Sequence, residues 1–410
     1  MKLGLITQIR NEIEILQPFL NHIDGLFDVV HVIDHQSVDG TTGVLKQAVS
    51  QRPLWHYYFL DIKTKAQTEV SNFLLHKAFE DDLDYLFFLD ADEFIEVASR
   101  QDLENRLIAW VDPMTAGALT WKNCILGNFH QKEFTARTPL YLPAAHSSFF
   151  KSVLSRRLYN TYNKQLTISE GNHLLYDPHG VEIPITPIGT LLHVPIRSLS
   201  QVESKVILTV IARRGYRERK AGTSFQYYEM LEKIADGKVS DDDLRGFTIG
   251  FERPNIPNTA VSEQQLLSRG YTLTTLQDLQ VVFSDRLQLD LQPVDPGIAR
   301  RVAGALNRLE ENFAANAPLV LEDGVIRLDN EKQNKMVSSI PAAPDGGGIF
   351  QSQAAQLEEQ SRRIHDLSVH NEHLSAELEQ ARQEILTYAQ SRSWKLTRPF
   401  RKVFGKMIRH

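Results

Sequence analysis

Short apolar runs alternate with segments of helical spacing over the first ninety residues, and this alternation limits the fold more than any other feature. The apolar runs cover residues 3–6, 29–33, 54–60 and 85–89. Apolar side chains between them recur at the spacing of one helix face, as do Leu16, Phe19, Leu20 and Ile23. Apolar strands that alternate with amphipathic helices predict a mostly parallel sheet covered on both faces, and therefore an α/β fold.

Polar residues lie at the carboxyl ends of three expected strands, namely Thr7, Asp34 and Asp90. Ligands of parallel sheets bind beyond these ends, so this edge is the expected ligand site. Asp34 can accept a hydrogen bond there from a base imide or a ribose hydroxyl. Residues 39–41, Asp-Gly-Thr, are most simply a turn and helix cap. The sequence shows no glycine-rich dinucleotide fingerprint and no Walker lysine motif at this edge.

The last apolar run leads directly into Asp90, Asp92 and Glu93. Carboxylates at the end of a buried strand are costly to desolvate and repel one another, so solvent, a helix N-terminus, cations or a bound metal must compensate them. Asp90 and Asp92 are alternate residues of an extended segment, so both can approach one divalent cation. Mg²⁺ and Mn²⁺ prefer such oxygen ligands. The alternative is that the two residues cap a helix or face solvent.

The bulk properties of the 410-residue chain exclude several classes of protein. A net charge of −6 gives no global basicity, so we expect no nucleic-acid partner. The single cysteine, Cys124, leaves no internal disulfide framework and fits a reducing compartment. The N-terminal apolar run is too short for a secretory signal, and no run is long enough for a membrane-spanning helix. We therefore expect a soluble, cytoplasmic protein.

Composition divides the chain into five expected parts. They are an α/β domain, a mixed helical extension, a flexible linker, a coiled coil and a basic tail, at residues 1–215, 216–336, 337–352, 353–390 and 391–410. The heptad positions of the coiled coil are Leu357, Ile364, Asn371, Leu378 and Ile385. A single Asn at such a position favours a parallel pair of helices, so we expect a parallel homodimer through this segment.

The tail from residue 391 to 410 holds seven Lys and Arg residues and no Asp or Glu. Its apolar residues follow one helical face, and Trp394 and Phe400 suit a membrane interface. Each basic residue contributes about 1 kcal/mol at an anionic membrane surface, so we expect peripheral association with the inner face of the plasma membrane. The alternative is a solubilising, disordered tail.

Four short motifs together resemble a known family. They are Arg10-Asn11-Glu12, Val32-Ile33-Asp34, Ser37-Val38-Asp39-Gly40-Thr41 and Leu89-Asp90-Ala91-Asp92-Glu93-Phe94. In this order they resemble the family-2 glycosyltransferases with the GT-A fold, and within it the bacterial cell-surface polysaccharide branch. The resemblance covers residues 1–210 and implies a nucleotide-diphosphate sugar donor, a divalent cation (Mn²⁺ or Mg²⁺), a glycan or lipid-linked acceptor, and inversion at the anomeric carbon.

The resemblance also implies roles for individual residues. Asp34 contacts the nucleoside, while Asn11 and Glu12 shape its pocket. Asp90 and Asp92 hold the ribose and the metal, and Thr7 and Asp39 line the donor site. His35 and Gln36 stand where Asp-Gly is commoner in the family.

A later group of residues is expected to complete the donor site. Similar enzymes have a late histidine that contacts the metal or the diphosphate, and His193 fits that place. Arg197 and Lys205 can neutralise diphosphate oxygens through charge-assisted hydrogen bonds. His173 is a second candidate for the same cleft. For each histidine, the alternative is an ordinary hydrogen-bonded residue of the core or surface.

Inversion needs a general base that takes the proton of the acceptor hydroxyl. Glu170 is the first candidate, because it lies in a glycine-containing loop between the acidic motif and His193, and Asp177 is the second. Trp55 and Trp121 are either sugar-stacking or core residues. Two other functions stay open: a sugar nucleotidylyltransferase, although residues 7–11 lack its glycines, and a non-catalytic, membrane-associated scaffold.

Overall fold

The computed structural model describes residues 1–62, 66–131, 133–214, 225–251, 259–291 and 319–328. These residues belong to one compact unit, Met1–Asn334. The expected linker (337–352), coiled coil (353–390) and basic tail (391–410) lie outside the described residues. In the described part of the chain, no helix has both the length and the apolar character needed to cross a bilayer.

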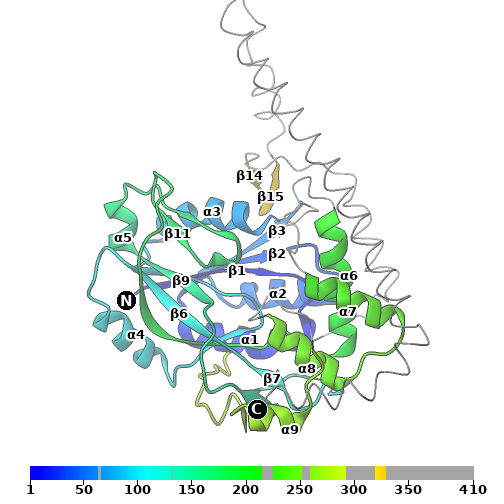
Figure 1. Ribbon diagram of the computed structural model, residues 1–410. Helices are drawn as coiled ribbons and strands as arrows, with labels where there is room; N and C mark the ends of the chain where they lie inside the picture. Colours follow the sequence, from blue (N-terminus) through cyan, green and yellow to red (C-terminus); the bar gives the residue numbers. More distant parts are fainter. Residues whose placement is uncertain (63–65, 132, 215–224, 252–258, 292–318, 329–410) are drawn as a thin grey trace, which may run out of the picture. The chain divides into compact units, whose positions relative to one another are not determined.

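The amino-terminal part has the expected alternation of strands and helices. Its elements are β1 (Leu3–Ile9), α1 (Ile13–Leu26), β2 (Val29–Asp34), α2 (Thr41–Ser50), β3 (Trp55–Leu60), α3 (Gln67–Ala78) and β4 (Tyr85–Phe88). The four strands are parallel neighbours in the order β3-β2-β1-β4 (Figure 1). The strand and helix segments expected from the apolar pattern are therefore confirmed, and β1 continues three residues beyond the expected end.

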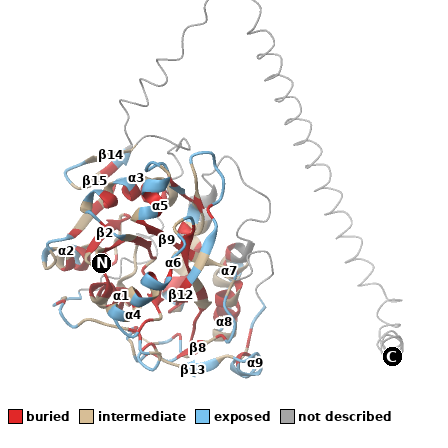
Figure 2. Cartoon of the chain, turned by 90° about the vertical axis from the view of Figure 1, so that its left-hand side faces the viewer, coloured by how far each residue is buried: buried red, intermediate tan, exposed pale blue. Residues whose placement is uncertain are grey.

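Successive side chains of these strands enter two different hydrophobic cores. Leu5 of β1 and Val32 of β2 pack with the residues of α1 and α2, while Ile6 and Ile33 pack with those of α3. This alternation follows from the pleat of a strand, and it explains why the strands are apolar on both faces. Figure 2 shows the central strands as mostly buried. The expected α/β fold is confirmed.

The complete sheet has ten strands in the order β14-β15-β3-β2-β1-β4-β9-β6-β12-β5. The strands not yet named are β5 (Glu93–Ile95), β6 (Ala116–Asn123), β9 (Phe150–Ser155), β12 (Ile185–His193), β14 (Leu319–Glu322) and β15 (Val325–Leu328). Strand β9 runs antiparallel to both β4 and β6, whereas β6 and β12 are parallel. The sheet is thus parallel around β1 and mixed beyond β4.

Short elements and the later helices surround this sheet. They are η1 (Phe79–Asp81), α4 (Arg100–Ala109), β7 (Ile125–Leu126), β8 (Leu140–Leu142), α5 (Arg156–Thr161), β10 (Thr167–Ile168), η2 (Glu170–Asn172), β11 (Leu175–Tyr176), α6 (Leu199–Arg214), α7 (Phe225–Ala235), α8 (Asp241–Gly250), α9 (Glu263–Ser268) and β13 (Thr272–Thr274). Tyr227 of α7 and Phe247 of α8 belong to the same hydrophobic core as α1. The described residues of segment 216–336 therefore pack on the α/β core.

The strand register brings the predicted ligand residues to one edge of the sheet. Ile9 at the end of β1 is paired with Asp34 at the end of β2, and Ile6 is paired with Phe88 at the end of β4. Asp90 follows β4 by two residues. Because all three strands are parallel, their carboxyl ends and the loops that follow them share this edge.

Candidate active site

A buried lysine compensates the acidic run after β4. Nζ of Lys151, on β9, lies 2.7 Å from Oδ2 of Asp90 and 3.5 Å from Oε2 of Glu93. The Lys151 side chain is only 1% exposed. The same Glu93 oxygen accepts a hydrogen bond from the backbone N–H of Asp90 at 2.8 Å. Burial raises the pKa of Glu93 well above its usual value, and Lys151 opposes that rise. Glu93, which has no role in the sequence-based account, thus holds the turn that carries Asp90.

Asp92 lies among cationic side chains. Its Oδ2 lies 3.4 Å from Nζ of Lys205 and 4.0 Å from a guanidinium nitrogen of Arg197. Burial opposes ionisation of Asp92, but Lys205, His193 and Arg197 together lower its pKa to about 2. The backbone carbonyl of Asp92 accepts a hydrogen bond from Val194, which joins the acidic turn to the end of β12. Asp92 is therefore a carboxylate at neutral pH.

His193, the last residue of β12, lies beside Asp92. Its Nε2 is 3.7 Å from Oδ1 of Asp92, and its Nδ1 is 2.6 Å from Oδ1 of Asn123 on β6. The imidazole stacks on the Trp121 indole, with 4.3 Å between ring centroids. Burial is the main cause that lowers the pKa of His193 to about 4, so the ring is neutral at pH 7. Because Nδ1 donates its proton to Asn123, the lone pair of Nε2 faces Asp92.

Two of the three predicted metal ligands, Asp92 and His193, are adjacent. A carboxylate oxygen and a neutral imidazole nitrogen at this separation suit Mn²⁺ or Mg²⁺, which would take its other ligands from donor phosphates and water. Asp90, the third predicted ligand, is instead paired with Lys151, and its other oxygen accepts a hydrogen bond from Gln67 at 3.2 Å. The donor set fits a divalent cation held by Asp92 and His193.

Arg197 and Lys205, the predicted diphosphate contacts, differ in accessibility. The Arg197 side chain is 2% exposed and forms an ion pair with Glu12 at the start of α1. Burial raises the pKa of Glu12 to about 7, against the opposing effect of Arg197. The Lys205 side chain is 25% exposed. Of the two cations beside Asp92, Lys205 is thus the one that an incoming anion reaches more easily.

Asp34, the predicted nucleoside contact, is fully buried. Its carboxylate accepts hydrogen bonds from the Ser37 backbone N–H at 3.0 Å, the Thr42 hydroxyl at 2.6 Å and the Tyr57 hydroxyl at 3.0 Å. Asp34 therefore holds the loop after β2.

The predicted donor-site residues Asn11 and Asp39 join the loop after β1 to the loop after β2. Oδ1 of Asn11 accepts a hydrogen bond from Val38, while the Asp39 carboxylate accepts from the backbone of Ile13 and of Thr41. Asn11 itself has a left-handed φ of 53°. The side chain of Thr7 is buried below these loops, and its Oγ1 makes no hydrogen bond.

The two candidate bases occupy different environments. Glu170 is exposed in η2, close enough to His173 to affect the pKa of that histidine. His173 packs edge-on against Trp121 at 5.4 Å, so the Glu170 loop docks beside the Lys151 and His193 cluster. Gly171 permits this approach: it has a φ of 74°, and a Cβ there would lie 2.5 Å from Nε2 of His173.

Asp177 supports a turn. Its Oδ1 accepts hydrogen bonds from the backbone N–H groups of His179 and Val181, both at 2.8 Å. Burial lowers the pKa of His173, whose ring contacts Trp121 and Phe149. Trp55 and Trp121 both belong to the hydrophobic core, and Trp121 also stacks on His193.

The sequence reasoning missed the roles of Lys151, Glu93 and Asn123. A lysine within the apolar strand 150–155 is itself a signal, since lysine is rarely buried unless paired. Asn123 has no comparable signal, because an amide at a strand end is common and its partner is distant in sequence.

No family model and no curated protein matches the sequence. Among solved structures, a mannosyltransferase from Pyrobaculum calidifontis in complex with GDP-Man and Mn²⁺ is similar at 15% identity, with 61% of this chain and 73% of that chain covered and a TM-score of 0.31. TarS of S. aureus (residues 1–349) is similar at 12% identity, with 80% and 96% covered and a TM-score of 0.31. The bifunctional glycosyltransferase WbbM is similar at 13% identity, with 52% and 34% covered and a TM-score of 0.22.

Proposed function

We propose that the chain is a glycosyltransferase that moves a sugar from a nucleotide-diphosphate donor to a glycan or lipid-linked acceptor, with inversion at the anomeric carbon. One observation carries the proposal: the Asp92 carboxylate lies beside Nε2 of His193, with Lys205 and Arg197 next to it, at the carboxyl edge of the sheet. This donor set suits a divalent cation and a diphosphate together.

The leaving diphosphate is the group that needs stabilisation in such a reaction. A bound Mn²⁺ or Mg²⁺ supplies Lewis-acid stabilisation of its oxygens. Lys205 is partly exposed, and its ammonium group lies beside Asp92. It would therefore neutralise a further part of the diphosphate charge through charge-assisted hydrogen bonds. Arg197 keeps Asp92 ionised and in place, while its pair with Glu12 ties this part of the site to the start of α1.

The transfer step itself forms one bond and breaks another. The acceptor hydroxyl gives its proton to a general base as its oxygen attacks the anomeric carbon, and the bond from that carbon to the diphosphate oxygen breaks. The electron pair leaves with the nucleoside diphosphate. We assign the base to Glu170, because it is exposed in the loop that docks beside the site.

We propose that the enzyme works in cell-surface polysaccharide synthesis, in the cytoplasm at the inner face of the plasma membrane. The seven basic residues of segment 391–410 support attachment to anionic lipid, and the heptads of segment 353–390 support a parallel homodimer. Two such tails per dimer would strengthen the attachment.

A screen of donor hydrolysis tests the proposed activity. The full-length protein is incubated with UDP-, GDP- and dTDP-sugars and Mn²⁺, and the released nucleoside diphosphate is measured. We expect release from at least one donor, and its loss in the Asp92→Asn variant. A scaffold without activity would release none, and a nucleotidylyltransferase would exchange pyrophosphate with the donor instead.

A further inference from the structure

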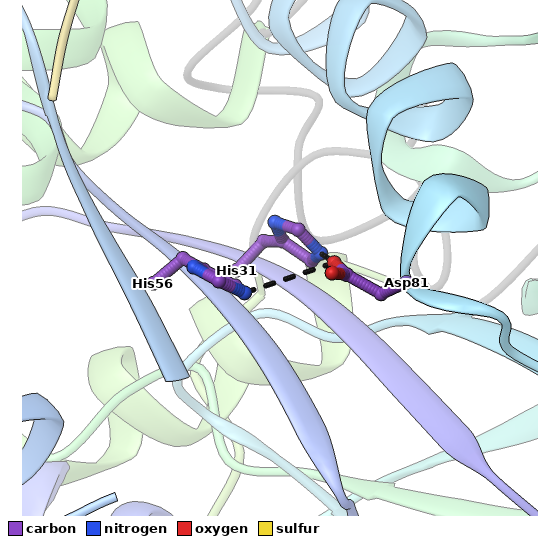
Figure 3. Close-up of side chains that lie close together, drawn as sticks. All are labelled: His31, His56 and Asp81. Carbon is purple, nitrogen blue, oxygen red and sulfur yellow. Dashed lines mark ion pairs between the residues drawn. The ribbon is translucent and has the colours of Figure 1, made fainter. Parts of the chain in front are cut away.

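Two histidines and an aspartate meet on the α3 side of the sheet, away from the candidate active site. His31 of β2 and His56 of β3 are register partners on adjacent parallel strands. Asp81 ends η1, which follows α3 and precedes β4. Figure 3 shows both rings directed toward the Asp81 carboxylate. Among the described residues, this is the group of three His, Cys, Asp or Glu whose ligand atoms all lie within 4.8 Å of one another.

The distances in the group suit a shared ion. Nε2 of His31 lies 3.2 Å and Nε2 of His56 lies 3.7 Å from Oδ2 of Asp81. Ligand bonds to Zn²⁺ are roughly 2.0–2.2 Å for nitrogen and carboxylate oxygen, which separates two ligand atoms of a tetrahedral site by about 3.3–3.5 Å. The two measured separations lie close to this range. The His56 and Asp81 side chains are 38% and 33% exposed, so neither is fixed by complete burial.

The state of His31 is a second and independent observation. Its side chain is 1% exposed, and its Nε2 is directed at Oδ2 of Asp81 within the group. Nδ1 of the same ring lies 3.1 Å from the hydroxyl of Tyr58. An imidazole that is held by a hydrogen bond at one nitrogen and directs the other nitrogen at the remaining ligands is the usual arrangement of a metal-binding histidine.

We propose that His31, His56 and Asp81 bind a transition-metal ion of the Zn²⁺ type. Two imidazoles and one carboxylate favour Zn²⁺, Co²⁺ or Ni²⁺ over Mg²⁺. The exposure of His56 and Asp81 leaves room for water as the fourth ligand. The ion joins β2, β3 and the end of the α3–η1 segment, so it stabilises the folded chain.

This site is separate from the one proposed for the sugar donor. Asp81 lies before the start of β4, at Tyr85, whereas Asp90 and Asp92 follow the end of that strand. The chemistry also differs, because the donor site has one imidazole among hard oxygen ligands. Lys77 and Lys2 lie near the group and weaken cation binding, but Lys77 pairs with Glu80 at 3.8 Å, which offsets part of its charge.

Co²⁺ binding to the full-length protein tests the proposal, since Co²⁺ reports its ligand geometry by visible absorption. The Asp92→Asn background removes any contribution from the donor site. We expect one Co²⁺ per chain, with the absorption bands of a tetrahedral or five-coordinate ion. His56→Ala and Asp81→Asn should each weaken binding about 10-fold or more, with unchanged circular dichroism. His130→Ala is the matched control, because His130 is 77% exposed and also pairs with an aspartate.

The melting temperature with and without Zn²⁺ distinguishes a metal site from a simple ion pair, because an ion pair would give no Zn²⁺-dependent increase. Zn²⁺ should raise the melting temperature of the Asp92→Asn protein and of its His130→Ala derivative, but not of the His56→Ala and Asp81→Asn derivatives. Equal Co²⁺ binding in the His56→Ala and His130→Ala derivatives would overturn the proposal. So would the absence of a bound ion in the parent protein, which would leave the group as an ion pair.

Discussion

The side-chain oxygen of Asn123 lies 2.6 Å from Nδ1 of His193, and this contact decides which nitrogen of the ring faces Asp92. Asn123 is itself held by Thr248, whose carbonyl accepts from its amide group at 3.4 Å. The orientation of the proposed metal ligand is therefore set by a residue on β6 and a helix from the carboxyl-terminal part of the unit. Loss of this contact would allow the His193 ring to turn or change tautomer.

The first prediction concerns this contact. Asn123→Ala should weaken Mn²⁺ affinity about 10- to 100-fold, because His193 loses the partner that fixes Nε2 toward the metal. Asn123→Asp keeps an oxygen acceptor and should retain most of the affinity. Titration of Mn²⁺ into each variant measures the effect. Equal affinities in wild type and Asn123→Ala would show that this contact does not position His193 for the metal.

The second prediction separates the two candidate bases. Glu170→Gln should lower kcat for transfer about 100-fold or more and leave the KM for the donor unchanged, because only proton removal from the acceptor is lost. Asp177→Asn retains an Oδ1 for the turn and should change kcat little. Steady-state kinetics with donor and acceptor varied separately provide the comparison. A large loss in Asp177→Asn with normal Glu170→Gln kinetics would reverse the assignment.

The third prediction concerns stability and pH. His22 is fully buried, its Nδ1–H donates to the Val282 carbonyl at 2.9 Å, and its Nε2 accepts from the Ile95 backbone at 2.9 Å. Only the neutral ring satisfies both contacts, and burial lowers the pKa of His22 from 6.5 to about 4. Since the folded-state pKa is below the unfolded one, this stabilisation is complete above pH 6.5 and decreases as the pH falls toward 4.

A shift of this size corresponds to about 3 kcal/mol of unfolding free energy between neutral pH and pH 4. In His22→Gln, which has a donor and an acceptor but no titration, the dependence on pH should be smaller by about that amount. Urea unfolding at pH 7 and pH 4 measures it for both proteins. The same pH dependence in both would mean that His22 does not contribute.

The fourth prediction tests the basic tail. Truncation after residue 390 removes seven Lys and Arg residues and should release the protein from vesicles that contain anionic lipid. Binding of the full chain should also weaken in high salt, because screening shortens the range of the attraction. Vesicle sedimentation is the assay, with neutral vesicles as the control. Unchanged binding of the truncated chain to anionic vesicles would refute the membrane role.

The amino-terminal half of the fold could be predicted because its signals are local. Each strand from β1 to β4 is an apolar run. The helices between them have apolar residues at the spacing of one helix face, as Leu16, Phe19 and Ile23 of α1 do. The mixed half of the sheet could not be predicted in this way. Strand β9 contains Lys151, whose burial depends on Asp90, 61 residues earlier in the chain. Such a pairing leaves no periodic pattern in the sequence.

Some residues of the candidate site could be predicted from the sequence, and others could not. Asp92 and His193 were both predicted to be metal ligands, and their side chains are adjacent. Lys205, which was predicted to contact the diphosphate, also lies beside Asp92, although 113 positions separate the two in the sequence. The supporting residues could not be predicted, because Asn123 and Glu93 act through contacts that only the folded chain makes. Asp34 and Asp39 were expected to meet the donor, and their oxygens are used to hold the loops of the site.

The most direct test of the proposed glycosyltransferase is isothermal titration with UDP-, GDP- and dTDP-sugars, each with and without Mn²⁺. The wild-type protein should bind at least one donor more tightly with Mn²⁺ than without it, and Asp92→Asn should lose this metal-dependent gain with unchanged circular dichroism. The Asp177→Asn variant, which changes only a carboxylate that supports a turn, should bind the donor as the wild type does. If no donor binds in a metal-dependent way, or if Asp92→Asn keeps the full gain, the proposed metal-assisted transfer is wrong.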